Sequence, residues 1–118
     1  MKPASGSADR LSLVFSALAD PTRRDILQRL AAARATVGEL AANYDISRPA
    51  ISQHLAVLER AGLIERVARA QWRECRVRRG GLDEAAAWLA RQRAEWSERF
   101  DLLDEHIRHR RMAGEETT

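Results

Sequence analysis

The chain has 118 residues, of which 31% are charged and 45% hydrophobic, and its formal net charge is +3. This length suits one domain with its own core and excludes two. No apolar run approaches the ~20 residues of a membrane-spanning helix, and the N-terminus M-K-P-A-S-G-S lacks the apolar centre of a signal peptide, so we expect a cytoplasmic protein without membrane contact.

Positive charge is concentrated in one stretch of the chain. Residues 61–80 hold six arginines against two glutamates. Arginine favours bidentate contacts with phosphate and guanine, although a solvated, charged surface gives the same count. Cys75 is the only cysteine, which excludes an internal disulfide and fits a reducing compartment.

The first half of the chain predicts two helices after a disordered lead-in at residues 1–8. Leu11, Val14, Phe15 and Leu18 follow helical spacing from Asp9 onward. A second helix begins where Asp20 can act as N-cap and Pro21 as the first helical residue. Arg23 and Arg24 near its start oppose the helix dipole, so we expect acidic or phosphate partners for them, or else a solvated role.

A short third helix and a turn follow. Thr36 and Glu39 form a T-x-x-E capping box, which predicts the start of this helix. It is expected to end around Asn43, which we predict to be left-handed because the turn lacks glycine. Two helices joined by such a turn constitute a helix-turn-helix.

The segment from Ser47 to Gly62 predicts the second helix of that motif. Ser47 is a good N-cap and Gly62 a good C-terminal residue, while Ile51, Leu55 and Leu58 form a narrow apolar stripe. The opposite surface carries hydrogen-bonding groups without a carboxylate until Glu59. Such a helix suits the major groove of DNA, although an ordinary surface helix shows the same features. For His54, at the edge of the stripe, we favour a DNA contact over partial burial.

The period then changes to that of strands. Residues 63–67 and 72–77 alternate apolar and polar side chains, which predicts a β-hairpin across residues 68–71. A hairpin in this place is the wing of a winged helix-turn-helix. Its arginines are expected to follow the DNA backbone or enter the minor groove; they are Arg66, Arg69, Arg73, Arg76 and Arg78.

A long helix is predicted from Asp83 to Arg111, and residues 112–118 are expected to be a frayed tail. Its apolar stripe repeats about every 3.5 residues, and at ~40 Å the helix is too long for so small a domain to cover. The stripe therefore needs a partner, either a second copy of the chain or the first helix. We expect Trp72, Trp88 and Trp96 to anchor the hairpin and the helix seam, rather than to form a ligand site.

The chain resembles the ArsR/SmtB family of bacterial winged-helix repressors. The resemblance rests on A-L-A-D-P-T-R-R-D-I-L-Q-R-L, S-R-P-A-I-S-Q-H-L-A-V-L-E-R-A-G-L-I and Q-W-R-E-C-R-V, and spans residues 11–107. It implies a mainly α fold of five helices with a small β-hairpin and a homodimer through the first and fifth helices. It also implies binding to an inverted-repeat operator and repression of transcription, including that of its own gene, by a nucleoid-associated protein.

The metal sites for which this family is known are not matched. Residues 36–40 offer no thiolate, and Asp104-x-His106 imitates only the first half of the site on the last helix. His106 and His109 could share a helix face and bind a metal weakly, but a solvated helix end is the simpler interpretation. We therefore predict no metal and no cofactor.

We predict a DNA-binding, dimeric repressor without enzymatic activity, since no phosphate loop, metal-ligand set or activated nucleophile is evident. The alternatives are a sensor of the same fold, switched by metal, by oxidation of Cys75 or by a small molecule, and a winged helix that binds only protein. The predicted DNA contacts, from helix 47–61 and wing 63–78, are Ser47, Arg48, Ala50, Ser52, Gln53, His54, Arg69, Gln71 and Arg73. The predicted dimer contacts are Leu11, Val14, Phe15, Trp88, Leu89, Gln92, Trp96, Phe100 and Leu103.

Overall fold

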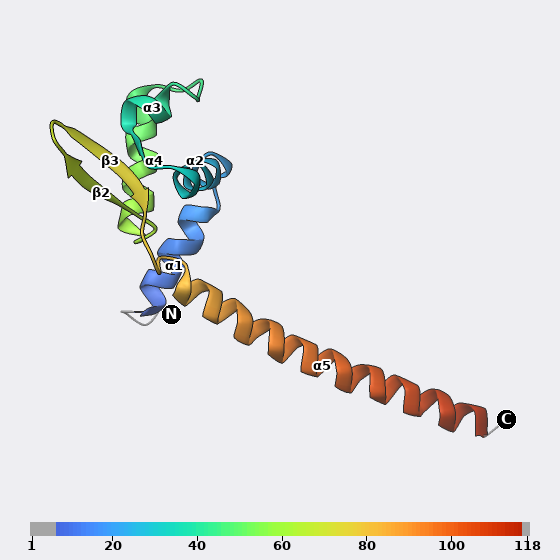
Figure 1. Ribbon diagram of the computed structural model, residues 1–118. Helices are drawn as coiled ribbons and strands as arrows, with labels where there is room; N and C mark the ends of the chain where they lie inside the picture. The colour runs from blue at the N-terminus through green and yellow to red at the C-terminus, as the bar shows by residue number, and fades with distance from the viewer. Residues whose placement is uncertain (1–6, 117–118) are drawn as a thin grey trace. The chain divides into compact units, whose positions relative to one another are not determined.

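The computed structural model describes residues 7–116 (Figure 1). This range contains five helices and three strands. In chain order they are α1 (Ser7–Leu18), α2 (Pro21–Ala32), β1 (Ala35–Thr36), α3 (Val37–Ala41), α4 (Arg48–Arg60), β2 (Ile64–Arg69), β3 (Trp72–Val77) and α5 (Asp83–Glu116). The chain divides into two units, residues 1–85 and residues 86–118. The prediction of five helices with a hairpin between the fourth and fifth is confirmed.

The expected caps begin the short helices. The Asp20 carboxylate accepts a hydrogen bond from the backbone N–H of Arg23 at 2.9 Å, and Pro21 occupies the first turn of α2. At α3, Thr36 Oγ1 accepts from the Glu39 N–H at 3.2 Å, and Glu39 Oε1 accepts from the Thr36 N–H at 3.0 Å. This reciprocal capping box gives a helix of five residues a defined start.

Helix α4 lies at the centre of the first unit, in contact with α1, α2, α3 and β2. Its apolar stripe is fully buried, and the side chains of this stripe are Ile51, Leu55 and Leu58. Ser47 Oγ accepts from the Ala50 N–H at 3.2 Å. At the other end Gly62 adopts a φ of 76°, and the Leu63 N–H reaches back to the Leu58 carbonyl, as in a Schellman motif.

The sheet has a third strand that the sequence analysis missed. The strand order is β1-β3-β2, and all pairs are antiparallel. Strand β1 places Ala35 opposite Cys75 and Thr36 opposite Glu74. A strand of two residues is too short to show a period, so alternation cannot reveal it. It ties the wing to the residue that caps α3.

The hairpin is tighter than the predicted four-residue connection. Pairing of β2 with β3 continues to Arg69 opposite Trp72, which leaves a two-residue turn at Ala70 and Gln71. Ala70 adopts a φ of 55°, a left-handed conformation that two-residue hairpin turns require of at least one central residue. The turn therefore forms without glycine or asparagine, at a cost in backbone strain.

The register also corrects the expectation for Trp72. Ile64 and Cys75 are buried on the inner face of the sheet, against the core. Because side chains alternate along a strand, Trp72 lies on the opposite, outer face, where it is 66% exposed. It therefore does not anchor the core. The odd spacing between Trp72 and the inward Cys75 already contains this information.

Among the described residues, the side chains of Arg23 and Arg24 bind backbone carbonyls rather than the acidic partners we considered. Arg23 Nε donates to the Ala17 carbonyl at 2.8 Å and its Nη2 to the Ser16 carbonyl at 3.0 Å. Arg24 Nη1 donates to the Leu18 carbonyl at 2.7 Å. Two guanidinium groups thus bind the last carbonyls of α1, where the helix dipole favours positive charge.

Two further local expectations differ from the structure. Among residues 7–116, Ala70 is the only non-glycine residue with positive φ, so Asn43 is not left-handed. Its side-chain Nδ2 instead donates to the Glu39 carbonyl at 2.9 Å and supports the end of α3. Helix α1 already includes Ser7 and Ala8, and α5 continues to Glu116 through the predicted tail, whereas residues 1–6 and 117–118 lie outside the described range.

Candidate nucleic-acid interface

The polar surface of α4 is formed by the predicted contact residues in the first half of the helix. Ser47, Arg48 and Gln53 are exposed, and Ala50, Ser52 and His54 are partly exposed. Gln53 presents an amide, which can donate and accept at the same time, as adenine edges require. The helix N-terminus adds free backbone N–H groups suited to a phosphate.

His54 lies among side chains of α2 and its N-cap rather than free on the surface. Its Nδ1 is 3.4 Å from Arg23 Nη1 and 4.0 Å from Asp20 Oδ2. A guanidinium can only donate, so Arg23 can hydrogen-bond to Nδ1 when this nitrogen carries no proton. The backbone N–H of Arg23 lowers the pKa of Asp20, and this carboxylate stays ionised beside the imidazole.

The side chain of Arg48 folds across α3. A Cβ placed on Gly38 would collide with the Arg48 guanidinium, so the absence of a side chain at Gly38 makes room for it. The obstacle is the far end of a flexible side chain, which can swing away. Gly38 therefore influences where Arg48 lies rather than whether the helix can form.

Carboxylates neutralise three of the five wing arginines. Arg76 Nε lies 2.9 Å from Glu65 Oε1 across the hairpin, and Arg69 Nε lies 3.6 Å from Glu74 Oε1. Arg66 Nε is 3.6 Å from Glu59 Oε1 at the end of α4, without a hydrogen bond. Within the described part of the chain, Arg73 and Arg78 have no such partner. Arg73, which lies within β3, is thus a wing cation available to a phosphate.

A three-residue cluster that the sequence analysis missed fixes the turn before α4. The Tyr44 hydroxyl donates to Asp25 Oδ2, and Arg29 Nε donates to the same oxygen at 3.0 Å. The Arg29 guanidinium also lies 5.4 Å from the centre of the Tyr44 ring. Burial and the Asp25 hydrogen bond raise the pKa of Tyr44 to about 12. These contacts join α2 to the turn, and local periodicity has no signal for them.

Cys75 is a poor candidate for oxidation. Its side chain is 1% exposed on the inner face of β3, and burial raises the pKa of its thiol. The thiolate is the form that reacts with oxidants. Burial therefore limits both the access of an oxidant to Cys75 and the fraction of the thiol that is deprotonated. The structure thus favours packing as the role of Cys75 over thiol sensing.

The predicted dimer residues fall into both units. In the first unit Val14 is 2% exposed and belongs to the chain's own core, so it offers no surface to a second copy. Leu11 and Phe15 are partly buried against that core, and Leu13, which we did not predict, is exposed. In the second unit Trp88 and Gln92 are partly exposed, and the remaining four predicted contacts are exposed; these are Leu89, Trp96, Phe100 and Leu103.

The metal candidates lie on the exposed surface of the second unit, where Asp104, His106 and His109 share α5. Between residues 7 and 116, no three His, Cys, Asp or Glu side chains gather as a metal site would require. In the same range no helix is both long and apolar enough to cross a bilayer.

Known proteins share this arrangement. A helix-turn-helix domain family matches residues 18–67. The HTH-type transcriptional regulator Rv2034 of Mycobacterium tuberculosis is 56% identical over 50 residues, which cover 42% of this chain and 47% of that protein. The transcriptional repressor SdpR of Bacillus subtilis is 47% identical over 51 residues, covering 43% and 57%. The matched segment thus spans about half the length of each of these regulators.

A solved structure covers more of the chain. An ArsR-like transcriptional regulator from Rhodococcus sp. RHA1 superimposes with a TM-score of 0.74 at 35% identity, over 82% of this chain and 92% of that one. The fold and the α4–wing arrangement are those of winged helix-turn-helix transcriptional regulators. The chain belongs to the ArsR family.

Proposed function

We propose that this protein is a homodimeric, sequence-specific DNA-binding repressor that reads an inverted repeat with α4 and holds the flanking backbone with the wing. The observation that carries the proposal is the first half of α4, where an exposed amide and hydroxyls lie on a helix that is rigidly packed on its other side. Membership of the ArsR family and the similarity to a transcriptional repressor support the same function.

The proposed DNA contact divides into readout and positioning. Gln53, Ser52 and Arg48 reach base edges, while the N-terminus of α4 at Ser47 holds a phosphate. Arg73 and Gln71 at the end of the wing contact the backbone beside the groove. His54 contributes through its Nε2, because Arg23 lies against Nδ1.

The proposed dimer follows from the apolar stripe of α5. Trp96, Phe100 and Leu103 are all more than half exposed in the single chain, and a helix with such a stripe requires a partner. A second copy buries the stripe symmetrically and sets two α4 helices about one DNA turn (~34 Å) apart. We propose that this dimer acts in the cytoplasm, at the nucleoid, and represses its own gene among others.

The decisive experiment selects genomic fragments bound by the purified protein and then measures their affinity by fluorescence anisotropy. Gln53→Ala is expected to lose about 1–3 kcal/mol of preference for the selected site over scrambled DNA. Gln28→Ala is the matched control, since Gln28 is an exposed glutamine on α2. The readout assignment fails if Gln53→Ala keeps the wild-type preference.

The same assay separates DNA binding from a role in protein contacts alone. A DNA-binding protein should also bind random duplex DNA weakly, and this binding should weaken as salt rises. Absence of any salt-dependent binding to random duplex would favour a winged helix used only for protein contacts. Transcription of the gene beside the selected site, with and without the protein, then tests repression.

A further inference from the structure

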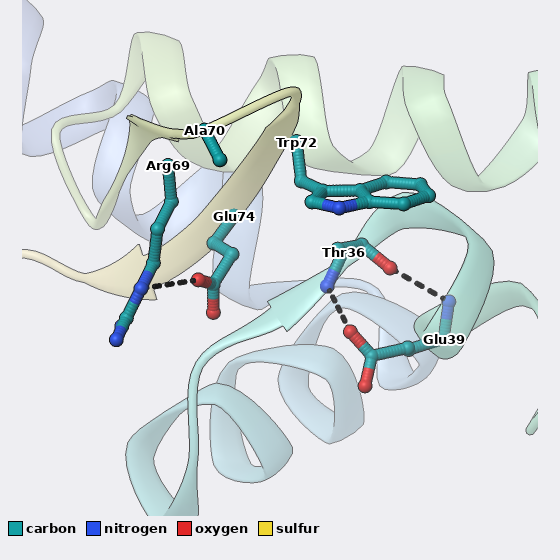
Figure 2. Close-up of a pocket in the computed structure, with 6 residues that line it drawn as sticks. All are labelled: Thr36, Glu39, Arg69, Ala70, Trp72 and Glu74. Carbon is teal, nitrogen blue, oxygen red and sulfur yellow. Dashed lines mark hydrogen bonds and ion pairs between the residues drawn. The ribbon is translucent and has the colours of Figure 1, made fainter.

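A cavity of about 540 Å³ lies on the outer face of the sheet, between the end of the wing and the start of α3. Its volume is in the range of pockets that hold small organic ligands. Figure 2 shows its walls, with the Trp72 ring over Thr36 and the Arg69–Glu74 pair on the other side. The full lining is Thr36, Glu39, Arg69, Ala70, Trp72 and Glu74.

The fold brings these walls together through β1. Thr36 is the strand partner of Glu74, so it places the first carboxylate beside the cavity. Thr36 also caps α3 and holds Glu39 Oε1 at 3.0 Å from its backbone N–H, which places the second. Trp72 lies on the same face of β3 as Glu74, two residues away, and its exposed indole closes one side.

The side chains that line the cavity favour one chemical class of ligand. The indole presents a flat π surface that attracts cations as well as aromatic rings. The Thr36 N–H lowers the pKa of Glu39, so this carboxylate is ionised at neutral pH. Glu74 Oε1 lies 3.6 Å from Arg69 Nε, which is too long for a strong hydrogen bond. A donor that comes closer to this carboxylate can therefore replace Arg69. The cavity is lined by two carboxylates and only one guanidinium, so its walls carry one negative charge that is not balanced.

We propose that this pocket binds a planar organic cation, an aromatic amine whose ring stacks on Trp72 and whose ammonium group lies between Glu39 and Glu74. DNA does not fit the pocket, because its phosphates would face both carboxylates. An anionic ligand meets the same repulsion, and a neutral ring leaves the carboxylates without a partner.

A consequence for DNA binding rests on the proposed function. An ammonium group that binds Glu74 competes with Arg69 for that carboxylate. Arg69 then becomes available to a phosphate, and the ligand itself adds positive charge to the wing. The amine should therefore tighten DNA binding, and by linkage DNA should tighten amine binding to the same degree.

Binding is tested without DNA by following the indole N–H signals in ¹⁵N-labelled protein by NMR. The Trp72 signal is assigned as the one that disappears in Trp72→Phe. Titration with 1-naphthylmethylammonium is expected to shift it saturably. The neutral 1-naphthylmethanol and the anionic 1-naphthoate should bind about tenfold more weakly or not at all, as expected on loss of a charge pair beside an aromatic ring.

Substitutions locate the site. Glu39→Gln keeps the capping box, since glutamine also serves at that position, and should weaken amine binding several-fold. Glu74→Gln should do the same. Glu65→Gln is the matched control, because Glu65 lies on the same face of the sheet outside the cavity. The proposal is overturned if the Trp72 signal does not move or moves equally with the neutral alcohol. It is also overturned if both glutamine variants bind the amine as tightly as the wild-type protein does.

A DNA arm keeps this inference separate from the proposed function. The amine is expected to raise the affinity of the wild-type protein for its selected site and to leave Glu74→Gln unchanged, which controls for binding of the amine to DNA itself. Equal affinity with and without the amine overturns the coupling. Loss of all DNA binding by the amine-free protein instead overturns the proposed function, whatever the NMR titration shows.

Discussion

At the scale of single residues, Arg23 makes the most connections. Its side chain contacts the last carbonyls of α1 and the imidazole of His54 in α4, while its backbone N–H binds the N-cap of α2. A guanidinium can reach these acceptors together because its donors form a rigid fork. Arg23 thus joins three helices at the point where α4 begins to present its polar surface.

Arg23→Ala should lower the free energy of unfolding by about 2 kcal/mol, because it removes two charge-assisted hydrogen bonds at a helix end. Arg23→Lys should recover only part of this loss, since one ammonium cannot reach both carbonyls in the same geometry. Urea unfolding measures both, and Arg34→Ala, an exposed arginine beyond α2, is the control. Wild-type stability in Arg23→Ala would contradict this role.

Ala70 offers the opposite test, in which a substitution is expected to stabilise. Its φ of 55° costs an alanine about 1 kcal/mol, whereas glycine adopts this conformation freely. Ala70→Gly should therefore raise the thermal midpoint by a few degrees. The larger chain entropy of glycine in the unfolded state reduces this gain. Ala68→Gly, on the neighbouring strand, should lower it. A destabilised Ala70→Gly would show that the turn is not strained.

Asp25 should make stability depend on pH. The hydrogen bond from Tyr44, followed by that from Arg29, lowers the pKa of Asp25 below its ordinary value of 3.8. A lowered pKa in the folded state means that this contribution is fully present above pH 3.8 and is lost as pH falls through the folded value. Asp25→Asn should therefore destabilise at neutral pH, with the difference shrinking in acid. Thermal midpoints of both proteins across that range provide the measurement, and a difference independent of pH would refute it.

At the scale of elements, the wing carries fewer free charges than the six arginines of residues 61–80 suggest. Because Glu74 already occupies Arg69 whereas Arg73 is unpaired in the described chain, Arg73→Ala should weaken DNA binding more than Arg69→Ala. Arg73→Ala should also reduce the slope of log affinity against log salt by about one. Anisotropy titrations at several salt concentrations compare the two. Equal losses would show that the Arg69–Glu74 pair opens on DNA.

Elements with local signals were predictable, and those that depend on distant partners were not. The caps Asp20, Thr36 and Ser47 are local and appear where the sequence places them. Strand β1 exists only because β3 lies beside it, and two residues have no period. The exposure of Trp72, by contrast, was predictable from alternation along β3, because Trp72 lies an odd number of residues from the inward Cys75.

The candidate interface divides in the same way. Which residues of α4 are exposed follows from its period, so Gln53 and Ser47 could be chosen from the sequence. The partners of those side chains could not. His54 meets Arg23 and Asp20 from 31 and 34 positions earlier in the chain (54 − 23 and 54 − 20), and pattern analysis has no access to such contacts.

At the scale of the whole molecule, assembly should depend on one side of α5. Leu103 and Leu102 are adjacent and both more than half exposed, but they point about 100° apart around the helix. Only Leu103 lies on the stripe with Trp96 and Phe100. Leu103→Glu should therefore convert the proposed dimer to a monomer and reduce operator affinity, whereas Leu102→Glu should retain the dimer. Analytical ultracentrifugation distinguishes the two, and a dimeric Leu103→Glu would exclude this seam.

The pairing of β1 with β3 has a consequence for the order in which the protein can fold during synthesis. Helices α1 to α4 leave the ribosome before the strand that completes the sheet, so Ala35 and Thr36 emerge well ahead of their partners Cys75 and Glu74. Until then the core that includes Leu40 and Ile51 lacks Ile64 and Cys75. We therefore expect the core of the helix-turn-helix to be complete only once the wing has been made.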